Sequence, residues 1–268
     1  MRTRGWLLAA LLVAGCVGAA RADDERRGPL PGAQAVAKPP AAPTGGSLEY
    51  DPWQGLNRKI FVFNDRLDEW VLEPVAKGWD FVAPKPVERS IGNFFGNLRF
   101  PVDLVNNLLQ GKGVEGAKTL GRFTINTLLG AGGFLDPASD LGLGPESEDF
   151  GQTLGVWGVP SGPYLVLPVL GPSSARDAPA LAVDTAAAIT PFFIDGWILV
   201  GARVIDVVNT RARFLEAVSE AKAASLDYYT FVRNAYVQRR QAQVEDRAQV
   251  PVPERTPTYD DSELYTLP

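Results

Sequence analysis

Apolar residues recur at intervals of three and four positions over much of this chain, which is the period of an amphipathic helix. The clearest run extends from residue 55 to residue 77, with polar side chains on its opposite side. Its apolar positions are Leu56, Ile60, Phe63, Leu67, Trp70 and Pro74. A stripe of this kind suits a buried core, and it equally suits a membrane interface, where tryptophan is favoured. The pattern leaves both interpretations open.

The same period marks further helices, and one segment lacks it. Helices are predicted at residues 102–109, 120–128, 178–188, 194–208 and 211–236. Residues 151–171 instead contain five glycines and three prolines, which predicts short extended pieces and turns. The sequence therefore predicts a mostly α-helical single domain at residues 48–237, with one Gly/Pro-rich irregular segment.

Both ends of the chain differ from this domain in composition. Residues 17–47 are rich in Ala, Pro and Gly and show no apolar period, so we expect a flexible tether. Residues 238–268 are polar and contain several prolines, so we expect a disordered tail. The sequence between them shows no internal repeat, which favours one domain.

The N-terminus combines a basic start with a short apolar stretch. Two arginines precede residues 6–13, which are apolar but too few to span a bilayer. Small residues then lead to Cys16, as in the lipobox of lipoprotein signal peptides. We predict a signal peptide at residues 1–16 with lipid attached to Cys16; ordinary cleavage after Ala22 is the alternative. Val17 follows the cysteine, so the aspartate that commonly retains lipoproteins in the inner membrane is absent.

Composition excludes several classes of function. The 268 residues carry a net charge of −5, which argues against a nucleic-acid partner because phosphate binding needs a positive surface. There is no histidine and one cysteine, which removes Ser-His-Asp and Cys-His catalysis, histidine-based metal sites and an intrachain disulfide. We therefore predict no catalytic residue, no metal ligand and no cofactor. Enzymes that use carboxylates, lysine or a serine-lysine pair are classes that this composition still allows.

Two glycine-rich motifs fail the spacing of nucleotide-binding loops. In residues 111–119, the lysine that follows the last glycine of a P-loop is replaced by Ala117. Residues 130–133 would need a third glycine at position 135 for a dinucleotide fingerprint, and Leu135 stands there. We expect a connection between helices in the first case, and an interhelical loop or a hinge in the second.

Several ordered stretches of the predicted domain are similar to one family. They include the runs DPWQGLNR, GNFFGNL, NTLLGAGGF and FGQTLG. The stretches lie at residues 51–58, 61–65, 92–98, 101–111, 122–137, 150–155, 162–171 and 227–239. Together with the lipobox, they make the chain resemble the MlaA (VacJ) outer-membrane lipoproteins over nearly the whole domain.

This resemblance implies a fold and a function. Members of the family are helical ring-like platforms embedded in the inner leaflet of the outer membrane, with a central amphipathic channel, and they are not enzymes. They remove misplaced phospholipid from the outer leaflet, associate with trimeric porins and pass lipid to a periplasmic lipid-binding protein of an ATP-driven inner-membrane transporter. Phospholipid is then the transported ligand. The residues expected to shape the lipid path are Asn57, Phe61, Phe63, Asn64, Gly130, Gly132, Gly133 and Phe134.

A lipid-anchored scaffold that binds porins without conducting lipid is the alternative function. It predicts aromatic stripes that are buried, and a domain that dissolves in buffer once Cys16 is removed. The channel predicts continued dependence on detergent after that change. A carboxylate hydrolase predicts a concave site with two close acids and a shifted pKa.

Overall fold

The computed structural model describes residues 51–188 and 195–246, which include nearly all of the predicted domain. The predicted signal peptide, Cys16, the tether and most of the predicted tail lie outside the described residues. Helices dominate the described part, and its two strands pair as one antiparallel hairpin. The mostly α-helical fold class is therefore confirmed.

The elements of the described part, in chain order, are as follows. The helices before the hairpin are α2 (Gln54–Leu67), the π-helix η1 (Asp68–Leu72), α3 (Glu73–Val82), α4 (Lys85–Leu98), α5 (Phe100–Leu109), α6 (Gly113–Leu128), α7 (Pro137–Asp140) and α8 (Phe150–Val156). The hairpin and the later helices are β1 (Tyr164–Leu167), β2 (Gly171–Ser174), α9 (Asp177–Ala187), α11 (Gly196–Arg213), α12 (Leu215–Ala224) and α13 (Tyr228–Val244).

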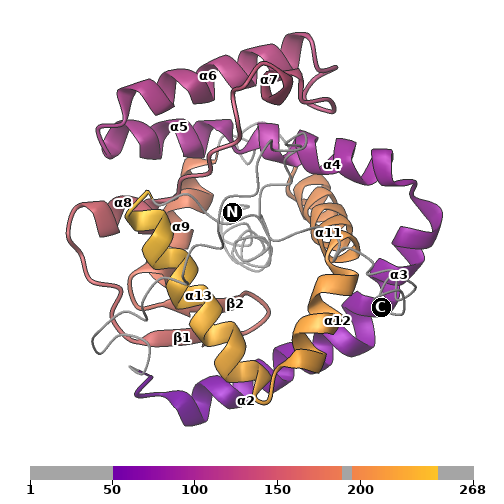
Figure 1. The fold of residues 1–268 in the computed structure, drawn as a ribbon, viewed down its shortest axis with the longest axis vertical. Coiled ribbons are helices and arrows are strands. Elements are labelled where there is room, and N and C mark those ends of the chain that lie inside the picture. The colour runs from indigo at the N-terminus through magenta and orange to yellow at the C-terminus, as the bar shows by residue number, and fades with distance from the viewer. Residues whose placement is uncertain (1–50, 189–194, 247–268) are drawn as a thin grey trace, which may run out of the picture.

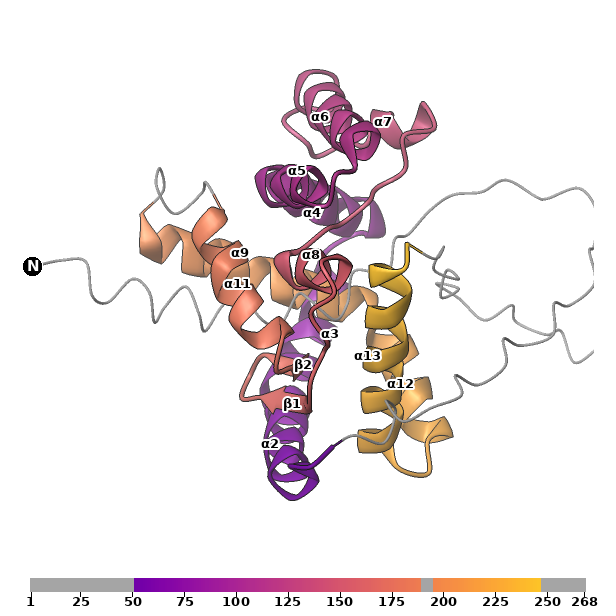
Figure 2. The ribbon, with the colours of Figure 1, turned by 90° about the vertical axis from the view of Figure 1, so that its left-hand side faces the viewer.

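The elements are arranged in a ring (Figure 1). In that view α2 and α3 run along the lower and right-hand edge, α4 and α5 lie at the top, and α8, α9 and the hairpin lie on the left. Turned by 90°, α9 and α11 lie on one side of this ring, while α12 and α13 lie on the other (Figure 2). Packing between segments distant in sequence, such as α3 with α11 and α13 with α8, closes the ring.

The first predicted helix is continuous but changes its winding. α2 leads directly into η1 and then α3, and the N–H of Glu73 reaches back five residues to the carbonyl of Asp68. Pro74 has no N–H, and its ring would crowd the carbonyl four residues earlier, at Trp70. Widening the preceding turn relieves that conflict, and single π turns of this kind are frequent at functional sites.

Three of the predicted elements need correction. The helix predicted at 211–236 is three pieces, because the chain breaks at Phe214 and again before α13, whose N-terminus Asp227 caps by accepting the Thr230 N–H. The irregular segment at 151–171 begins as helix α8. Helix α13 extends to Val244, seven residues past the predicted domain end at 237, so the predicted tail begins as helix.

Two further boundaries follow from the structure. Residues 111–119 form the turn after α5 and then the first part of α6, which starts at Gly113. The predicted connection between helices therefore covers this turn and the start of α6.

Helix α4 is absent from the elements predicted by periodicity, although part of its sequence carries the family resemblance.

Candidate lipid-facing surface and polar interior

The distribution of polar and apolar side chains is inverted relative to an ordinary water-soluble domain. Buried apolar residues in the described part include several alanines, whereas the largest fully buried side chains are all polar. The latter are Glu88, Asn57, Asn107, Asn209, Thr153 and Asp206. Large apolar side chains lie outside, with Phe81 91%, Trp197 83% and Trp70 72% exposed. Large apolar residues exposed in such numbers mark contact with a membrane or a partner.

The exposed apolar side chains are distributed over many elements. They come from α2, η1, α3, α5, α6, α11 and other segments. None of the described helices combines the length and the apolar character needed to cross a membrane. The aromatic stripe of the first helix is therefore only partly core, since Phe63 is 54% exposed and Trp70 72%.

Two asparagines predicted to shape the lipid path, Asn57 and Asn64, hold the hairpin against α2. Asn57 donates from Nδ2 to the Tyr164 carbonyl at 3.0 Å, and its Oδ1 accepts the Val166 N–H at 3.0 Å. Asn64, two helical turns later, makes the same pair of bonds with the Leu167 carbonyl and the Val169 N–H, at 2.9 and 2.8 Å.

Each asparagine amide pairs with backbone N–H and C=O groups of the hairpin as a neighbouring strand would. Asn57 is only 1% exposed, so its amide serves the packing of α2 on the hairpin, and its role in shaping the lipid path stays a prediction. The physical reason is that β1 has one unpaired edge, whose backbone groups must find partners when buried. The half-buried Asn64 serves the next stretch of the same edge.

The two phenylalanines of α2 have different surroundings. Phe61 packs edge-on against Tyr228 and Tyr229, with ring centroids 5.5 and 5.4 Å apart, beside the small apolar core around Tyr164. Phe63 points away from that core and is 54% exposed. Of this pair, only Phe63 presents a large apolar surface, and its contact with lipid stays a prediction.

The Gly130–Gly133 cluster is a tight C-terminal turn of α6. A Cβ at Gly130 would lie 2.4 Å from two backbone carbonyl oxygens, so no side chain fits there. Gly132 and Gly133 have φ of +77° and +98°, in the region that favours glycine. A Cβ at Gly133 would also lie 2.7 Å from Asn97 of α4. The cluster therefore fixes where α6 meets α4, which favours the interhelical loop of the two interpretations.

The residue after this turn, Phe134, packs on α4. Its ring stacks on Phe94 at a centroid distance of 4.7 Å, and its carbonyl accepts a bond from Asn93 at 3.4 Å. The side chain is still 43% exposed. The loop thus places one aromatic edge outside the fold, and its role on a lipid path stays a prediction.

Buried charges tie α13 to the other side of the ring. Arg240 donates from both Nη atoms to Asp149, at 2.6 and 2.9 Å, and from Nε to Asp177 at 2.9 Å. Burial opposes ionisation of both aspartates, but the Arg240 guanidinium outweighs it and holds the pKa of each carboxyl below its ordinary value. This ion pair lies in the part of α13 that the sequence assigned to the tail.

Asp184 of α9 is a buried carboxyl with the opposite shift. It accepts the Phe150 N–H at 3.1 and 3.0 Å and a bond from Asn106 at 3.1 Å. Burial raises the pKa of Asp184 to about 6, and the neighbouring charge of Asp149 adds to this, while Arg99 acts against it. The group therefore takes up a proton on folding at mildly acidic pH.

Asp184→Asn is expected to remove a gain in stability on mild acidification. A raised native pKa favours the folded state once the carboxyl is protonated, so stability from this group falls as pH rises from about 4 through 6. Between pH 7 and pH 5 the wild type should gain about 1 kcal/mol from Asp184 relative to the variant. Chaotrope unfolding in detergent at both pH values measures the difference, and an equal pH response of the two proteins would contradict it.

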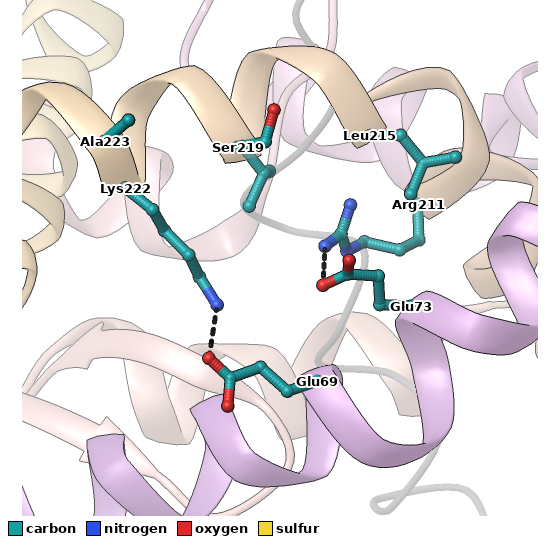
Figure 3. Close-up of a pocket in the computed structure, with 8 residues that line it drawn as sticks. Glu69, Glu73, Arg211, Leu215, Ser219, Lys222 and Ala223 are labelled. Atoms are coloured by element: carbon teal, nitrogen blue, oxygen red, sulfur yellow. Dashed lines mark hydrogen bonds and ion pairs between the residues drawn. The ribbon is translucent and has the colours of Figure 1, made fainter.

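A cavity of about 440 Å³ lies between the η1–α3 stretch and α12 (Figure 3). Its residues are Glu69, Glu73, Arg211, Leu215, Val218, Ser219, Lys222 and Ala223. Lys222 bonds Glu69 at 3.4 Å and Arg211 pairs with Glu73 at 3.5 Å, across the cavity from α11 and α12. The apolar period puts Glu69 on the polar side of the first helix, but the sequence gave no signal that Arg211 and Lys222 would face this wall.

The comparisons with known proteins agree with this arrangement. The model of the MlaA lipoprotein family matches residues 49–243. The chain belongs to the MlaA lipoprotein family. The MlaA match ends one residue before the end of α13, which supports a domain that extends beyond residue 237.

Relatives named intermembrane phospholipid transport system lipoprotein MlaA occur in Shigella flexneri and Haemophilus influenzae. They are 38% and 37% identical to this chain; the alignments cover 70% and 73% of it and 76% and 80% of theirs. A solved structure, reported for the structural basis of maintenance of bacterial outer membrane lipid asymmetry, superposes with a TM-score of 0.65 at 37% identity. It covers 72% of this chain and 98% of its own, so the MlaA fold is shared over the described domain.

Proposed function

We propose that this chain is an outer-membrane lipoprotein that removes misplaced phospholipid from the outer leaflet and passes it on for transfer between membranes. The observation that carries the proposal is the inverted surface, with tryptophan and phenylalanine outside and asparagine, aspartate and glutamate inside. Membership of a family whose relatives are named for phospholipid transport supports the same conclusion.

The energetics of moving a phospholipid head group across a leaflet explain why a helical ring with an apolar outer surface is suited to lipid transfer. A head group that crosses a leaflet must pass hydrocarbon, and burying its charge without partners is very costly. The proposed channel would supply polar partners on the way, and the helices of the ring satisfy their own backbone hydrogen bonds in lipid. The proposed central amphipathic channel needs no covalent chemistry, so we propose a transporter rather than an enzyme.

The proposed location follows from the anchor and the surface together. Lipid on Cys16 would hold the chain on the periplasmic leaflet of the outer membrane, and the exposed apolar residues would embed the ring there. A trimeric porin is the proposed neighbour in the membrane, and a periplasmic lipid-binding protein of an ATP-driven transporter is the proposed acceptor. Of the expected lipid-path residues, the exposed Phe63 and Phe134 fit this role best.

A deletion strain tests the proposal. Loss of the gene is expected to raise the phospholipid accessible on the cell surface and the sensitivity to detergent with chelator. Wild type should restore both, and Cys16→Ala should not, because the anchor is lost. Unchanged surface phospholipid in the deletion strain, with an altered amount or assembly of a porin, would replace the transport proposal with the scaffold.

A membrane-partitioning experiment tests whether the exposed aromatic side chains contact lipid. The double variant Phe81→Ser with Trp197→Ser would be made in the Cys16→Ala background. It is expected to partition into membranes at least tenfold less than its parent. The reason is that each aromatic ring contributes about 1.5–3 kcal/mol when buried in apolar surroundings. Lys59→Ser, at an exposed polar position of α2, is the matched control and should leave partitioning unchanged. Equal partitioning of the double variant and the control would mean that these rings do not contact lipid.

A further inference from the structure

The cavity between η1–α3 and α12 carries charges of both signs on facing walls. Glu69 and Glu73 stand on one wall, and Arg211 and Lys222 stand opposite (Figure 3). Leu215, Val218 and Ala223 complete the lining together with Ser219. A balanced pair of acids and bases around a partly apolar hollow is an arrangement that a ligand with one positive and one negative group would complement.

Each of the two cations makes its shortest contact with an aspartate beside the cavity, on the same continuous helix as the two glutamates. Lys222 lies 2.7 Å from Asp65 and 3.4 Å from Glu69, and Arg211 lies 2.8 Å from Asp68 and 3.5 Å from Glu73. In each case the short contact is with the flanking aspartate. The contacts of these cations with Glu69 and Glu73 are longer, at 3.4 and 3.5 Å, and Glu73 has its short contact of 2.7 Å with Lys77 of its own helix.

Arg211 also has unused capacity for hydrogen bonds. Its Nε and Nη2 donate to the two oxygens of Asp68, at 2.8 and 3.0 Å, in a bidentate pair. Its Nη1 is buried and has no hydrogen-bond partner within the described part of the chain. A buried donor left without an acceptor is unfavourable, and a phosphate oxygen is an acceptor that this remaining guanidinium N–H can bind.

We infer that this cavity binds a zwitterionic phospholipid head group, with its phosphate between Arg211 and Lys222 and its primary ammonium against Glu69 and Glu73. The inference rests on the proposed function and names a class of lipid for it. An anionic head group without an amine fits less well, because it would bring no positive group to Glu69 and Glu73. The cavity volume of about 440 Å³ admits a head group and part of its glycerol, with the acyl chains left outside.

Binding of two lipids to the purified full-length protein in detergent tests this inference. Phosphatidylethanolamine and phosphatidylglycerol with identical acyl chains would be titrated and counted by native mass spectrometry. Wild type is expected to prefer the ethanolamine lipid by about tenfold, as a charge-assisted hydrogen bond of the ammonium would give. Equal affinity for the two lipids would overturn the inference.

Two kinds of variant test whether the preference for phosphatidylethanolamine arises in this cavity. Ser219→Phe fills it from the exposed face of α12 and is expected to weaken binding of phosphatidylethanolamine about tenfold. Ala224→Phe, an exposed residue of the same helix outside the cavity, is the matched control and should stay within twofold of wild type. Glu69→Gln keeps the shape of the side chain and is expected to abolish the preference for the ethanolamine lipid while phosphatidylglycerol still binds.

The outcomes separate this inference from the proposed function. If Ser219→Phe and Glu69→Gln both bind and discriminate the lipids as wild type does, the cavity is not the head-group site. If these variants also restore the deletion strain fully, lipid transfer stands without the cavity. If wild type itself fails to lower surface phospholipid in the deletion strain, the proposed function fails whatever the binding data show.

Discussion

Arg240→Ala is expected to lower the free energy of unfolding by about 3–5 kcal/mol, because it removes the shared partner of a buried ion-pair network and leaves Asp149 without this guanidinium and Asp177 with Arg176 alone. Arg240 is 12% exposed and holds Asp149 and Asp177 on two other helices. Its loss would separate α13 from α8 and α9, so the effect should be on the whole domain. Thermal or chaotrope unfolding in detergent measures it.

Gln238→Ala is the matched control for this variant. Gln238 lies exposed on the same helix, less than one turn away, and its change should cost less than about 0.5 kcal/mol. The pH dependence adds a second test. Lowered native pKa values of Asp149 and Asp177 stabilise the fold above about pH 4, and this contribution is lost as pH falls further. The difference between wild type and Arg240→Ala should therefore be full at pH 7 and shrink below pH 4; a difference that stays constant would contradict the assignment.

Gly130→Ala is expected to destabilise the domain by about 3 kcal/mol or more. Its Cβ would lie 2.4 Å from the carbonyl oxygens of Asn126 and Leu135, and both belong to backbone that is already hydrogen-bonded in this turn. The end of α6 would have to move away from α7, which is costlier than the shift of a flexible side chain. Unfolding in detergent measures the loss, and restoration of the deletion strain reports whether the displaced turn also impairs function.

Gly132→Ala separates the clash from the backbone strain at this turn. Gly132 has φ of +77° with open space around its Cβ position, so alanine there should cost only about 1–2 kcal/mol. Gly132→Asn should cost less still, since asparagine tolerates this backbone conformation better. Equal losses for Gly130→Ala and Gly132→Ala would show that steric contact at Gly130 is not what fixes the turn.

The helices with a regular apolar period could be predicted from sequence, and those rich in glycine could not. Helix α4 contains Gly92 and Gly96, and α8 contains Gly151 and Gly155, which intrinsic propensity counts against a helix. In α8 these glycines permit close approach: a Cβ at Gly151 would meet Arg240 and Asp177 at 2.5 Å, and one at Gly155 would meet Val244 at 2.6 Å. Close packing, which periodicity does not report, outweighs the propensity.

The polar interior was the part of the candidate site least accessible from sequence. A polar residue on an amphipathic helix is normally assigned to the water side, and Asn57 instead lies buried against a hairpin more than 100 residues later. The partners of Arg240 are likewise 63 and 91 residues away. A single sequence gives no signal for such pairs. The family resemblance predicted the function and the fold class, but not which polar groups hold the ring together.

The inverted interior also has a consequence for the heat capacity of unfolding. Exposure of apolar surface to water raises the heat capacity, and exposure of polar surface lowers it. The largest fully buried side chains here are amides, acids and a threonine, so opening the interior adds little to that quantity. A small heat-capacity change flattens the curve of stability against temperature. The buried interior of this fold is therefore expected to contribute little to the temperature dependence of its stability.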